Sequence, residues 1–376
     1  MDDIRIGVVG LGYMGGLHAK YLAQNEVKGA RLAAVCDAQI ATLAIANELD
    51  SQIARFDDFE KMVDSGLIDA VFICTPHYFH PEQAIFAFEQ GLHVMVEKPA
   101  GVYTKQVKEM NEAARKSGTV FSMMYNQRTL PVYNKLKDLI DSGELGEIRR
   151  TNWIITDWYR SQSYYDSGTW RATWAGEGGG LLINQNPHQL DLWQWTIGMM
   201  PKRIRAFCHF GKRRHIEVED DVTAYVEYDN GATGVFVTSC SDAPGTNRFE
   251  VTGSRGKIVI EENNMAFWRL RVPEEQFNQN FKGKFGQPEH WKVNLPVDCS
   301  LEFNIEQHKT ITQNWVNAIV KGDELIAPGE EGIRGLTISN AMLLSTWIDD
   351  WVDLPIDEEL FYSKLQEKIH ASEHRA

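Results

Sequence analysis

The sequence predicts an α/β chain with two domains: a parallel, doubly wound sheet, then an α+β domain with an open, mostly antiparallel sheet. Short apolar runs alternate with helical segments from residue 4 to residue 124, which is typical of parallel sheets. After residue 220, longer alternating runs are joined by Asp-Asn-Gly and Gly-Ser-Arg-Gly, which are hairpin signals. A length of 376 residues suits two domains, and we place them at 1–125 and 126–376.

The first domain is predicted from buried strands that end in polar or glycine-rich segments. Each apolar run is followed by a segment with helical spacing, as a parallel sheet with crossover helices requires. We expect strands at 4–9, 32–36, 70–74, 93–96 and 120–124, a short segment at 54–56, and helices at 14–24, 41–49, 58–64, 82–90 and 104–116.

The second domain is predicted to begin with a helix at 132–141 that stops at Gly143. A further helix starts near His188, either with Pro187 in its first turn and Asn186 as N-cap, or earlier with a bend at Pro187. The remaining expected elements are hairpins at 223–228 with 233–238 and at 248–251 with 257–260, and packing helices at 306–321 and 333–351.

Composition excludes several classes of function. The formal net charge is −14, which argues against nucleic acid as a partner. The five cysteines are scattered, so we expect neither a disulfide framework nor a metal site, and a reducing, cytoplasmic location. No apolar run approaches 18 residues and the first residues are acidic, so we expect no membrane span and no signal peptide.

A glycine-rich turn follows the first predicted strand. Gly10 would turn the chain, Gly12 would leave room for a pyrophosphate, and Gly15 would let the next helix pack closely. The N-terminus of that helix attracts phosphate groups. Asp37 ends the second strand, about twenty residues on, where an acid binds the ribose hydroxyls. This spacing predicts a dinucleotide-binding domain, with NAD preferred to NADP because Asp37 would repel a 2′-phosphate.

Ligands of such sheets lie beyond the carboxyl ends of the strands, where several polar residues occur. Pairs of residues follow the strands at 70–74, 93–96 and 120–124, and one of them is Glu97-Lys98. The predicted cofactor-binding residues are Gly10, Gly12, Tyr13, Met14, Gly15, Asp37, Thr75, Pro76, His80, Glu97, Lys98 and Asn126.

A segment rich in aromatic rings and arginines runs from Trp153 to Trp174, ahead of a glycine run and His188. Such a mixture can bind single-stranded nucleic acid, but the acidic balance opposes this. The rings could instead face a sugar, or pack in the core or at a subunit interface. We expect one or two to contact substrate. The predicted substrate-binding residues are Lys98, Tyr125, Trp158, Arg160, Trp170, Asn184 and His188.

Three motifs together resemble the Gfo/Idh/MocA family of oxidoreductases, which includes glucose–fructose oxidoreductase and inositol dehydrogenases. These motifs are the glycine turn, Glu97-Lys98-Pro99, and the glycine run followed by His188 and Asp191. The resemblance covers nearly the whole chain. It implies a Rossmann domain, a C-terminal domain whose sheet forms the oligomer interface, and oxidation or reduction of a sugar or cyclitol alcohol with a nicotinamide cofactor.

The resemblance also implies roles for single residues. Lys98 matches the catalytic lysine, His188 the proton-transfer histidine and Asp37 the ribose-binding acid. Asn184 stands where many members have an aspartate, and an amide cannot act as a general base. The stretch from Tyr164 to His188 resembles members that act on glycosides and anhydrosugars.

Elementary chemistry supports the same roles, because alcohol oxidation needs a base whose pKa lies near neutral pH and a cation beside the developing alkoxide. We therefore expect His188 to accept the proton and Lys98 to assist. Two alternatives remain: a catalytically silent nucleotide-binding regulator, and a glycosidase that uses NAD transiently. Val226, Val235 and Val237 predict that the second face of the C-terminal sheet is partly apolar. A homodimer or homotetramer through that sheet is therefore expected.

Overall fold

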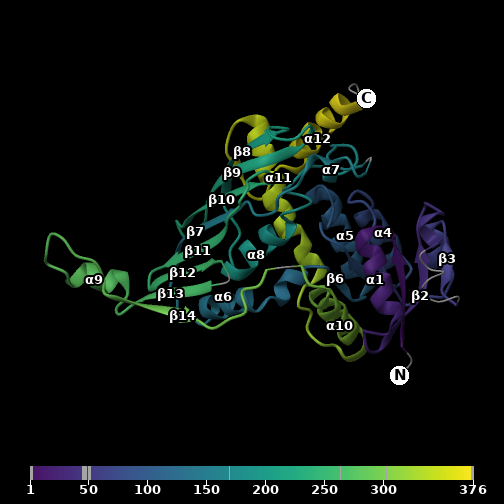
Figure 1. Ribbon diagram of the computed structural model, residues 1–376, viewed down its shortest axis with the longest axis horizontal. Helices are drawn as coiled ribbons and strands as arrows, with labels where there is room; N and C mark the ends of the chain where they lie inside the picture. The colour runs from purple at the N-terminus through teal and green to yellow at the C-terminus, as the bar shows by residue number, and fades with distance from the viewer. Residues whose placement is uncertain are drawn as a thin grey trace. The chain divides into compact units, whose positions relative to one another are not determined.

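The computed structural model describes residues 3–44, 49, 52–168, 170–262, 264–301 and 303–373. These residues form two compact units, shown in Figure 1. The first unit contains residues 1–129, 175–178 and 304–336, and the second contains residues 130–174, 179–303 and 337–376. The predicted boundary at residue 125 stays a prediction.

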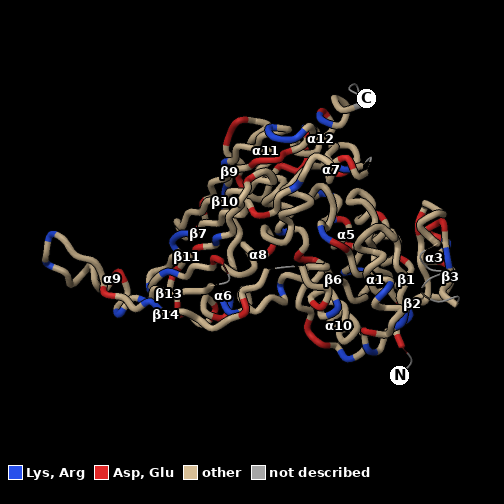
Figure 2. Tube along the Cα trace, in the orientation of Figure 1, with Lys and Arg blue, Asp and Glu red and all other residues tan. Residues whose placement is uncertain are grey.

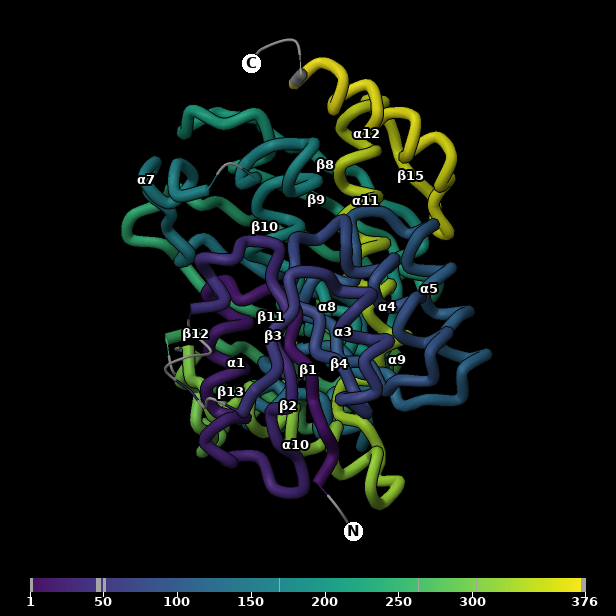
Figure 3. Tube along the Cα trace, turned by 90° about the vertical axis from the view of Figure 1, so that its right-hand side faces the viewer, coloured from purple at the N-terminus to yellow at the C-terminus, as the bar shows by residue number. Residues whose placement is uncertain are grey.

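The first unit is built on a six-stranded parallel sheet with the strand order β3-β2-β1-β4-β5-β6. Its strands run next to one another through the centre of this unit in Figure 3. The central strands β1 and β4 are almost wholly buried, as strands covered on both faces must be. The bounds are β1 Ile4–Val9, β2 Ala30–Cys36, β3 Ala54–Phe56, β4 Ala70–Ile73, β5 His93–Val96 and β6 Phe121–Met123.

Helices join these strands as the sequence predicts. Of the expected helix at 41–49, a 3-10 turn over Thr42–Ala44 is seen, and residues 45–48 lie outside the described residues. Pro81 is the third residue of its helix, in the first turn, where the missing N–H costs nothing. The helices are α1 Tyr13–Ala23, α3 Phe59–Asp64, α4 Phe79–Glu89, α5 Thr104–Ser117 and the 3-10 helix Asn126–Thr129.

A segment from late in the chain completes the first unit. Helix α10, Ile305–Lys321, places the buried ring of Trp315 edge-on to Phe72 of β4, with ring centroids 6.5 Å apart. After α10, the backbone bridges from Pro328 to Ser122 of β6. Residues more than 180 positions apart thus share one core.

The second unit holds a nine-stranded sheet with the order β14-β13-β12-β11-β7-β10-β9-β8-β15. Only the pair of β10 and β7 is parallel, and the other neighbours are antiparallel. Both predicted hairpins are present. The strands are β7 Ile148–Ile155, β8 Arg203–Phe210, β9 Glu219–Glu227, β10 Thr233–Ser239, β11 Asn247–Gly253, β12 Gly256–Glu261, β13 Asn264–Leu270, β14 His290–Leu295 and β15 Val352–Asp353.

One face of this sheet is covered by helices. The ring of Trp153 on β7 stacks on Phe249 at 4.2 Å, and Trp193 of a covering helix stacks on Phe236 at 5.3 Å. Both tryptophans are buried. The helices of this unit are α6 Pro131–Asp141, α7 Gln162–Tyr165, α8 Pro187–Ile197, α9 Glu274–Asn280, α11 Gly332–Ile348, which begins in the first unit, and α12 Glu358–Glu373.

The opposite face is left uncovered within the unit. Val235 pairs with Tyr225, which is 39% exposed, and both lie on this face. The prediction that Val226 shares it is wrong. The hairpin register pairs Val226 with Gly234, so its side chain points to the helix-covered face, where it is fully buried.

An arm extends from the end of the sheet between β13 and β14. Figure 1 shows α9 and its loop projecting beyond β14, away from the other strands. Figure 2 shows acidic residues near the base of the arm and basic residues near its tip. The first turn of α9 contains Glu274 and Glu275, and the loop after it contains Lys282 and Lys284. The side chain of Phe285 is 94% exposed.

Within the described part of the chain, no helix has both the length and the apolar character needed to cross a membrane.

Candidate functional site

The glycine turn between β1 and α1 has the geometry that its spacing predicts. Gly10 has a φ of +82°, and a Cβ there would lie 2.7 Å from backbone atoms of Cys74. A Cβ on Gly15 would lie 1.8 Å from the carbonyl oxygen of Gly10. A Cβ on Gly12, in contrast, would meet nothing within 4 Å. Two glycines are thus needed for packing, and the third faces open space at the N-terminus of α1.

Asp37 lies against this turn. One carboxylate oxygen accepts a hydrogen bond from the backbone N–H of Leu11 at 2.8 Å, and the other accepts one from Gln39 at 2.8 Å. The carboxylate is therefore fixed beside the turn that would hold a pyrophosphate. Open space at Gly12, the free end of α1 and this carboxylate fit a dinucleotide in the expected orientation.

The loop after β4 is held by its own polar side chains. Thr75 donates its hydroxyl to Gln83 at 2.7 Å, and both ring nitrogens of His80 lie near carbonyl oxygens, 2.6 Å from Thr75 and 2.7 Å from Pro99. Burial lowers the pKa of His80, while these two carbonyls oppose the shift. The ring of His80 donates to one of these carbonyls, so His80 would act on a cofactor by fixing this backbone.

Lys98 follows β5 at the same edge of the sheet. The Glu97 N–H donates to Ile73 at 2.9 Å, which continues the pairing of β5 with β4 by one residue. The carboxylate of Glu97 is buried, accepting the Lys98 N–H at 3.0 Å and a hydrogen bond from His18 at 2.7 Å. Glu97 therefore fixes the backbone of Lys98 from the interior of the domain.

Tyr125 and Asn126, just after β6, are also buried. Asn126 donates its amide to Gln307 of α10 at 2.9 Å, and the Tyr125 hydroxyl donates to the carbonyl oxygen of Gly332 at 3.4 Å. Both predicted residues are thus tied to the late segment of this unit, which sequence reasoning did not connect to them.

His188 is the second residue of α8, with Asn186 as N-cap and Pro187 at the first position. The alternative of an earlier helix bent at Pro187 is wrong. A separate turn precedes α8, in which the Asn184 N–H donates to Gly180 at 3.0 Å. Asn184 is half-buried and His188 is 7% exposed.

The glycine run before this turn has a packing role. A Cβ on Gly180 would lie 2.1 Å from the carbonyl oxygen of Glu219 on β9. The buried Glu219 carboxylate accepts the N–H groups of Gly180 and Leu182 at 2.9 and 3.0 Å. This contact anchors the segment that leads to His188.

The aromatic segment divides into two groups. Trp153, Tyr165 and Trp174 are buried core residues. In the other group, Arg171 lies 4.7 Å from the ring of Trp170 and 4.8 Å from the ring of Tyr164, and Arg160 lies 5.1 Å from Tyr164 and 5.6 Å from Trp158. The predicted substrate residues Trp158, Arg160 and Trp170 all belong to this partly exposed cation–π cluster.

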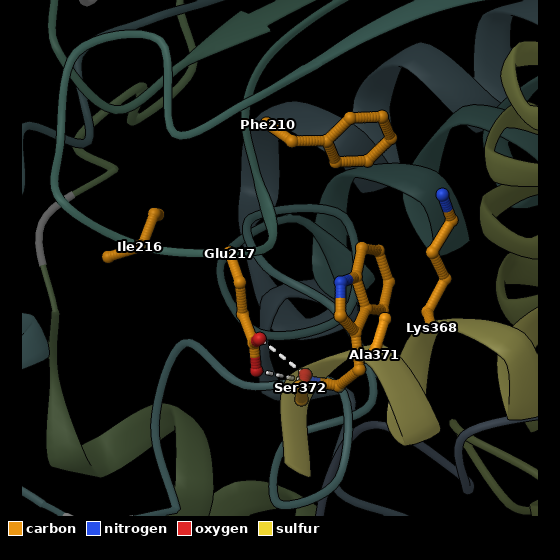
Figure 4. Close-up of a pocket in the computed structure, with 7 residues that line it drawn as sticks. Phe210, Ile216, Glu217, Lys368, Ala371 and Ser372 are labelled. Carbon is orange, nitrogen blue, oxygen red and sulfur yellow. Dashed lines mark hydrogen bonds between the residues drawn. The ribbon is translucent and has the colours of Figure 1, made fainter. Parts of the chain in front are cut away.

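A cavity of about 320 Å³ lies elsewhere in the second unit, between the end of β8 and α12 (Figure 4). It contains none of the predicted site residues. Glu217 accepts hydrogen bonds from the Trp174 N–H at 3.0 Å and from the Ser372 hydroxyl. Its remaining lining residues are Phe210, Ile216, Lys368 and Ala371.

Residues 4–125 match the model of an oxidoreductase family with an NAD-binding Rossmann fold, and residues 133–259 match that of the GFO/IDH/MocA C-terminal domain. The chain belongs to the Gfo/Idh/MocA family. The predicted family, fold class and NAD cofactor are therefore confirmed, and the chain is an NAD-dependent oxidoreductase.

Similar members of the Gfo/Idh/MocA family include sugar and cyclitol dehydrogenases. The scyllo-inositol 2-dehydrogenase (NAD(+)) of Bacillus subtilis is 30% identical, over 69% of this chain and 74% of that protein. The levoglucosan dehydrogenase of Pseudarthrobacter phenanthrenivorans is 25% identical, over 94% and 99%. The crystal structure of the WlbA dehydrogenase from Bordetella pertussis, with NADH and UDP-GlcNAcA, has a TM-score of 0.78 at 25% identity, covering 94% of this chain and 100% of that one.

Sequence reasoning missed one polar group of this Gfo/Idh/MocA domain. His18, Tyr21 and His308 surround Glu97 in the core, linked by the contacts described below. A signal was present, since His18 stands between the apolar residues Leu17 and Ala19 of α1, three residues after Gly15. A buried polar residue needs a partner, but the sequence does not say that this partner is Glu97.

Proposed function

We propose that this protein oxidises a ring secondary alcohol of a sugar, glycoside or cyclitol with NAD. The observation that carries the proposal is the position of Lys98, fixed by Glu97 at the sheet edge where the glycine turn and Asp37 also lie. The named activities of the relatives support the substrate class. Bound NAD would supply the hydride acceptor.

The residues of the chain divide the remaining work. Lys98 carries a positive charge that stabilises the alkoxide as it develops and orients the hydroxyl. His188 accepts the hydroxyl proton, because imidazole has a pKa near the working pH. Asn184 hydrogen-bonds substrate or water and is not a base. The cation–π cluster of Trp158, Arg160, Tyr164, Trp170 and Arg171 presents ring faces and N–H donors to the sugar.

The test is a panel of free sugars, inositols and glycosides, read by absorbance of the reduced nicotinamide. Cofactor reduction with at least one ring polyol is expected. Activity confined to acyclic 2-hydroxy acids would contradict the substrate class. Glycoside cleavage without net cofactor reduction would indicate the transient use of NAD, and NAD binding without any turnover would indicate a regulator.

We also propose that the chain forms a homodimer or homotetramer through the uncovered face of the nine-stranded sheet. Ile154, Phe207 and Tyr225 on that face are 38%, 53% and 39% exposed. Val235 and Val237 lie between them and add to the apolar area, which is costly to leave in water. Sedimentation should give a dimer or tetramer at micromolar concentration, and a monomer would contradict the proposal.

A cytoplasmic location is proposed from the cysteines. All five are free thiols in the structure, and four of them are buried. Such thiols persist in a reducing compartment. Fractionation of the native host, with the protein found in a membrane or secreted fraction, would contradict this.

A further inference from the structure

A chain of buried polar groups leads from α1 to the backbone of Lys98. His18 is fully buried, and its ring stacks on Phe72 at 4.2 Å. Its Nε2 lies 2.7 Å from Oε1 of Glu97, and its Nδ1 lies 2.8 Å from the hydroxyl of Tyr21. That hydroxyl is in turn 2.7 Å from the hydroxyl of Thr312 on α10.

Glu97 is ionised over the whole working range of pH. Burial alone raises the pKa of its carboxyl, but the hydrogen bond from His18 and the charges of His18, His308 and Lys98 outweigh burial and lower the pKa to about 2. An ionised carboxylate can only accept hydrogen bonds. His18 therefore carries a proton on Nε2, which it donates to Oε1 of Glu97.

The two carboxylate oxygens of Glu97 join two functional parts of the domain. Oε1 is bound to His18, which stands one turn into the helix that begins at the glycine turn. Oε2 is bound to the N–H of Lys98. The titratable groups around this carboxylate come from five parts of the unit: His18 and Tyr21 of α1, Cys74 after β4, His80 of α4, Lys98 after β5, and His308 of α10.

We propose that His18 and Glu97 are positioning residues for Lys98. They hold its backbone in a fixed relation to the helix that carries the phosphate-binding turn, so that the ammonium group meets the substrate oxygen correctly. The inference rests on the proposed function, in which Lys98 assists the oxidation. Neither residue is expected to touch substrate or to exchange a proton with it.

The test compares substitutions at both ends of this hydrogen bond. His18→Leu removes the donor, and a displacement of Lys98 by about 1 Å would lower kcat roughly 100-fold. His18→Gln keeps an N–H donor near the same place and is expected to retain most of the kcat. The NAD dissociation constant, measured by fluorescence quenching, should stay nearly unchanged in both variants.

Glu97→Gln provides a readout that a merely structural role would not move. It removes the buried negative charge that favours the protonated amine of Lys98. The alkaline limb of the kcat/KM pH profile is therefore expected at lower pH than in the wild type. An unmoved limb in a folded, NAD-binding protein would overturn the proposal.

Ser122→Ala is the matched control, since it also removes one buried hydrogen bond, to Ala327, in the same unit. It should lower stability without lowering kcat. If Ser122→Ala and His18→Leu reduce kcat equally, or if His18→Leu retains the wild-type kcat, the pair does not position Lys98.

Failure of the proposed function can be told apart from failure of this inference. If wild-type protein oxidises no ring alcohol, the proposed function fails, and the reactivity of the Lys98 amine still tests the pair. The rate at which an amine reagent modifies Lys98 can be measured at several pH values by peptide mass spectrometry. The pH dependence of this rate should change in Glu97→Gln and His18→Leu but not in Ser122→Ala. An identical pH dependence in all variants would overturn the inference.

Discussion

The two units hold their candidate residues in different ways. In the first unit, Asp37, His80 and Glu97 are fixed by hydrogen bonds to the backbone of neighbouring segments. In the second, the aromatic segment supplies core rings such as Trp153 and a partly exposed group in which Arg160 and Arg171 lie against rings. A motif defined by backbone geometry therefore predicts the position of a site closely. A segment defined only by its many aromatic residues contains both rings that pack in the core and rings that are exposed to a ligand.

The sharpest test of this comparison is the removal of one reacting group from each unit. Lys98→Met and His188→Ala should each lower turnover by about 10²–10⁴-fold, because each removes a positioned acid–base or electrostatic group. NAD affinity should be nearly unchanged. The double variant should lose less than the product of the single losses, since groups that act together are not additive.

Near-normal turnover of His188→Ala on the true substrate would show that the second unit does not supply the proton acceptor through His188. The proton acceptor would then be Lys98 itself or a tyrosine of the aromatic segment.

The division within the aromatic segment can be tested with a matched pair of tryptophans. Trp153→Ala should lower the free energy of unfolding by about 3–5 kcal/mol, because it empties a buried site against Phe249 and Tyr133. Trp170→Ala should cost much less stability and should raise KM. Denaturant unfolding and steady-state kinetics of the two variants check this, and equal losses of stability would contradict the division.

Acid sensitivity should be concentrated in the buried group of the first unit. Burial lowers the pKa of His308 from 6.5 to about 4, and that of Glu97 is lowered from 4.5 to about 2. As the pH is lowered, each group takes up its proton in the unfolded chain at a higher pH than in the folded one. The free energy of unfolding therefore decreases as the pH is lowered from 6.5 to 4 for His308 and from 4.5 to 2 for Glu97.

Each group should contribute at most on the order of 3 kcal/mol to this loss. His308→Gln should flatten the decline between pH 6.5 and 4, as measured by denaturant unfolding at several pH values. An unchanged slope in this variant would place the acid sensitivity elsewhere.

The smallest expected effect is a change of cofactor preference at the glycine turn. Asp37→Ser removes a carboxylate that would bind both ribose hydroxyls and repel a 2′-phosphate. A lost hydrogen bond to a charged group is worth about 1.5–3 kcal/mol, or roughly 10–100-fold in the efficiency with NAD. The ratio of kcat/KM for NAD and NADP measures this. Equal use of both cofactors by the wild type would defeat the expectation.

The fold was predictable from sequence because its signals are local. Strand β5 has the predicted bounds, and the hairpin of β11 and β12 turns where its glycines predict. Val226 was misplaced because the face of a strand residue depends on the register of its partner, here Gly234. The registers of the two strands cannot be read from either strand alone.

The candidate site was predictable only where backbone geometry demands a residue type. At Gly10 and Gly15, a Cβ would clash with the turn. At Asp37, loss of the carboxylate would leave the N–H of Leu11 in the turn without its hydrogen bond. The contact between His18 and Glu97 joins residues 79 positions apart, and His308 comes from a helix that follows strand β14 of the second sheet. Such partners become visible only when the chain is folded.

The arm between β13 and β14 gives the molecule a natural cleavage site. The described residues of α9 have no buried side chain, and Lys282 and Lys284 stand beside the almost fully exposed ring of Phe285. Trypsin should cut there first, because proteases favour exposed loop tips. The cut would leave every strand of the nine-stranded sheet intact. The rate of this cleavage should therefore be measured at several protein concentrations. A rate that falls as the concentration rises would show that assembly of the chain covers the end of the sheet that bears the arm, and a constant rate would show that this end stays exposed.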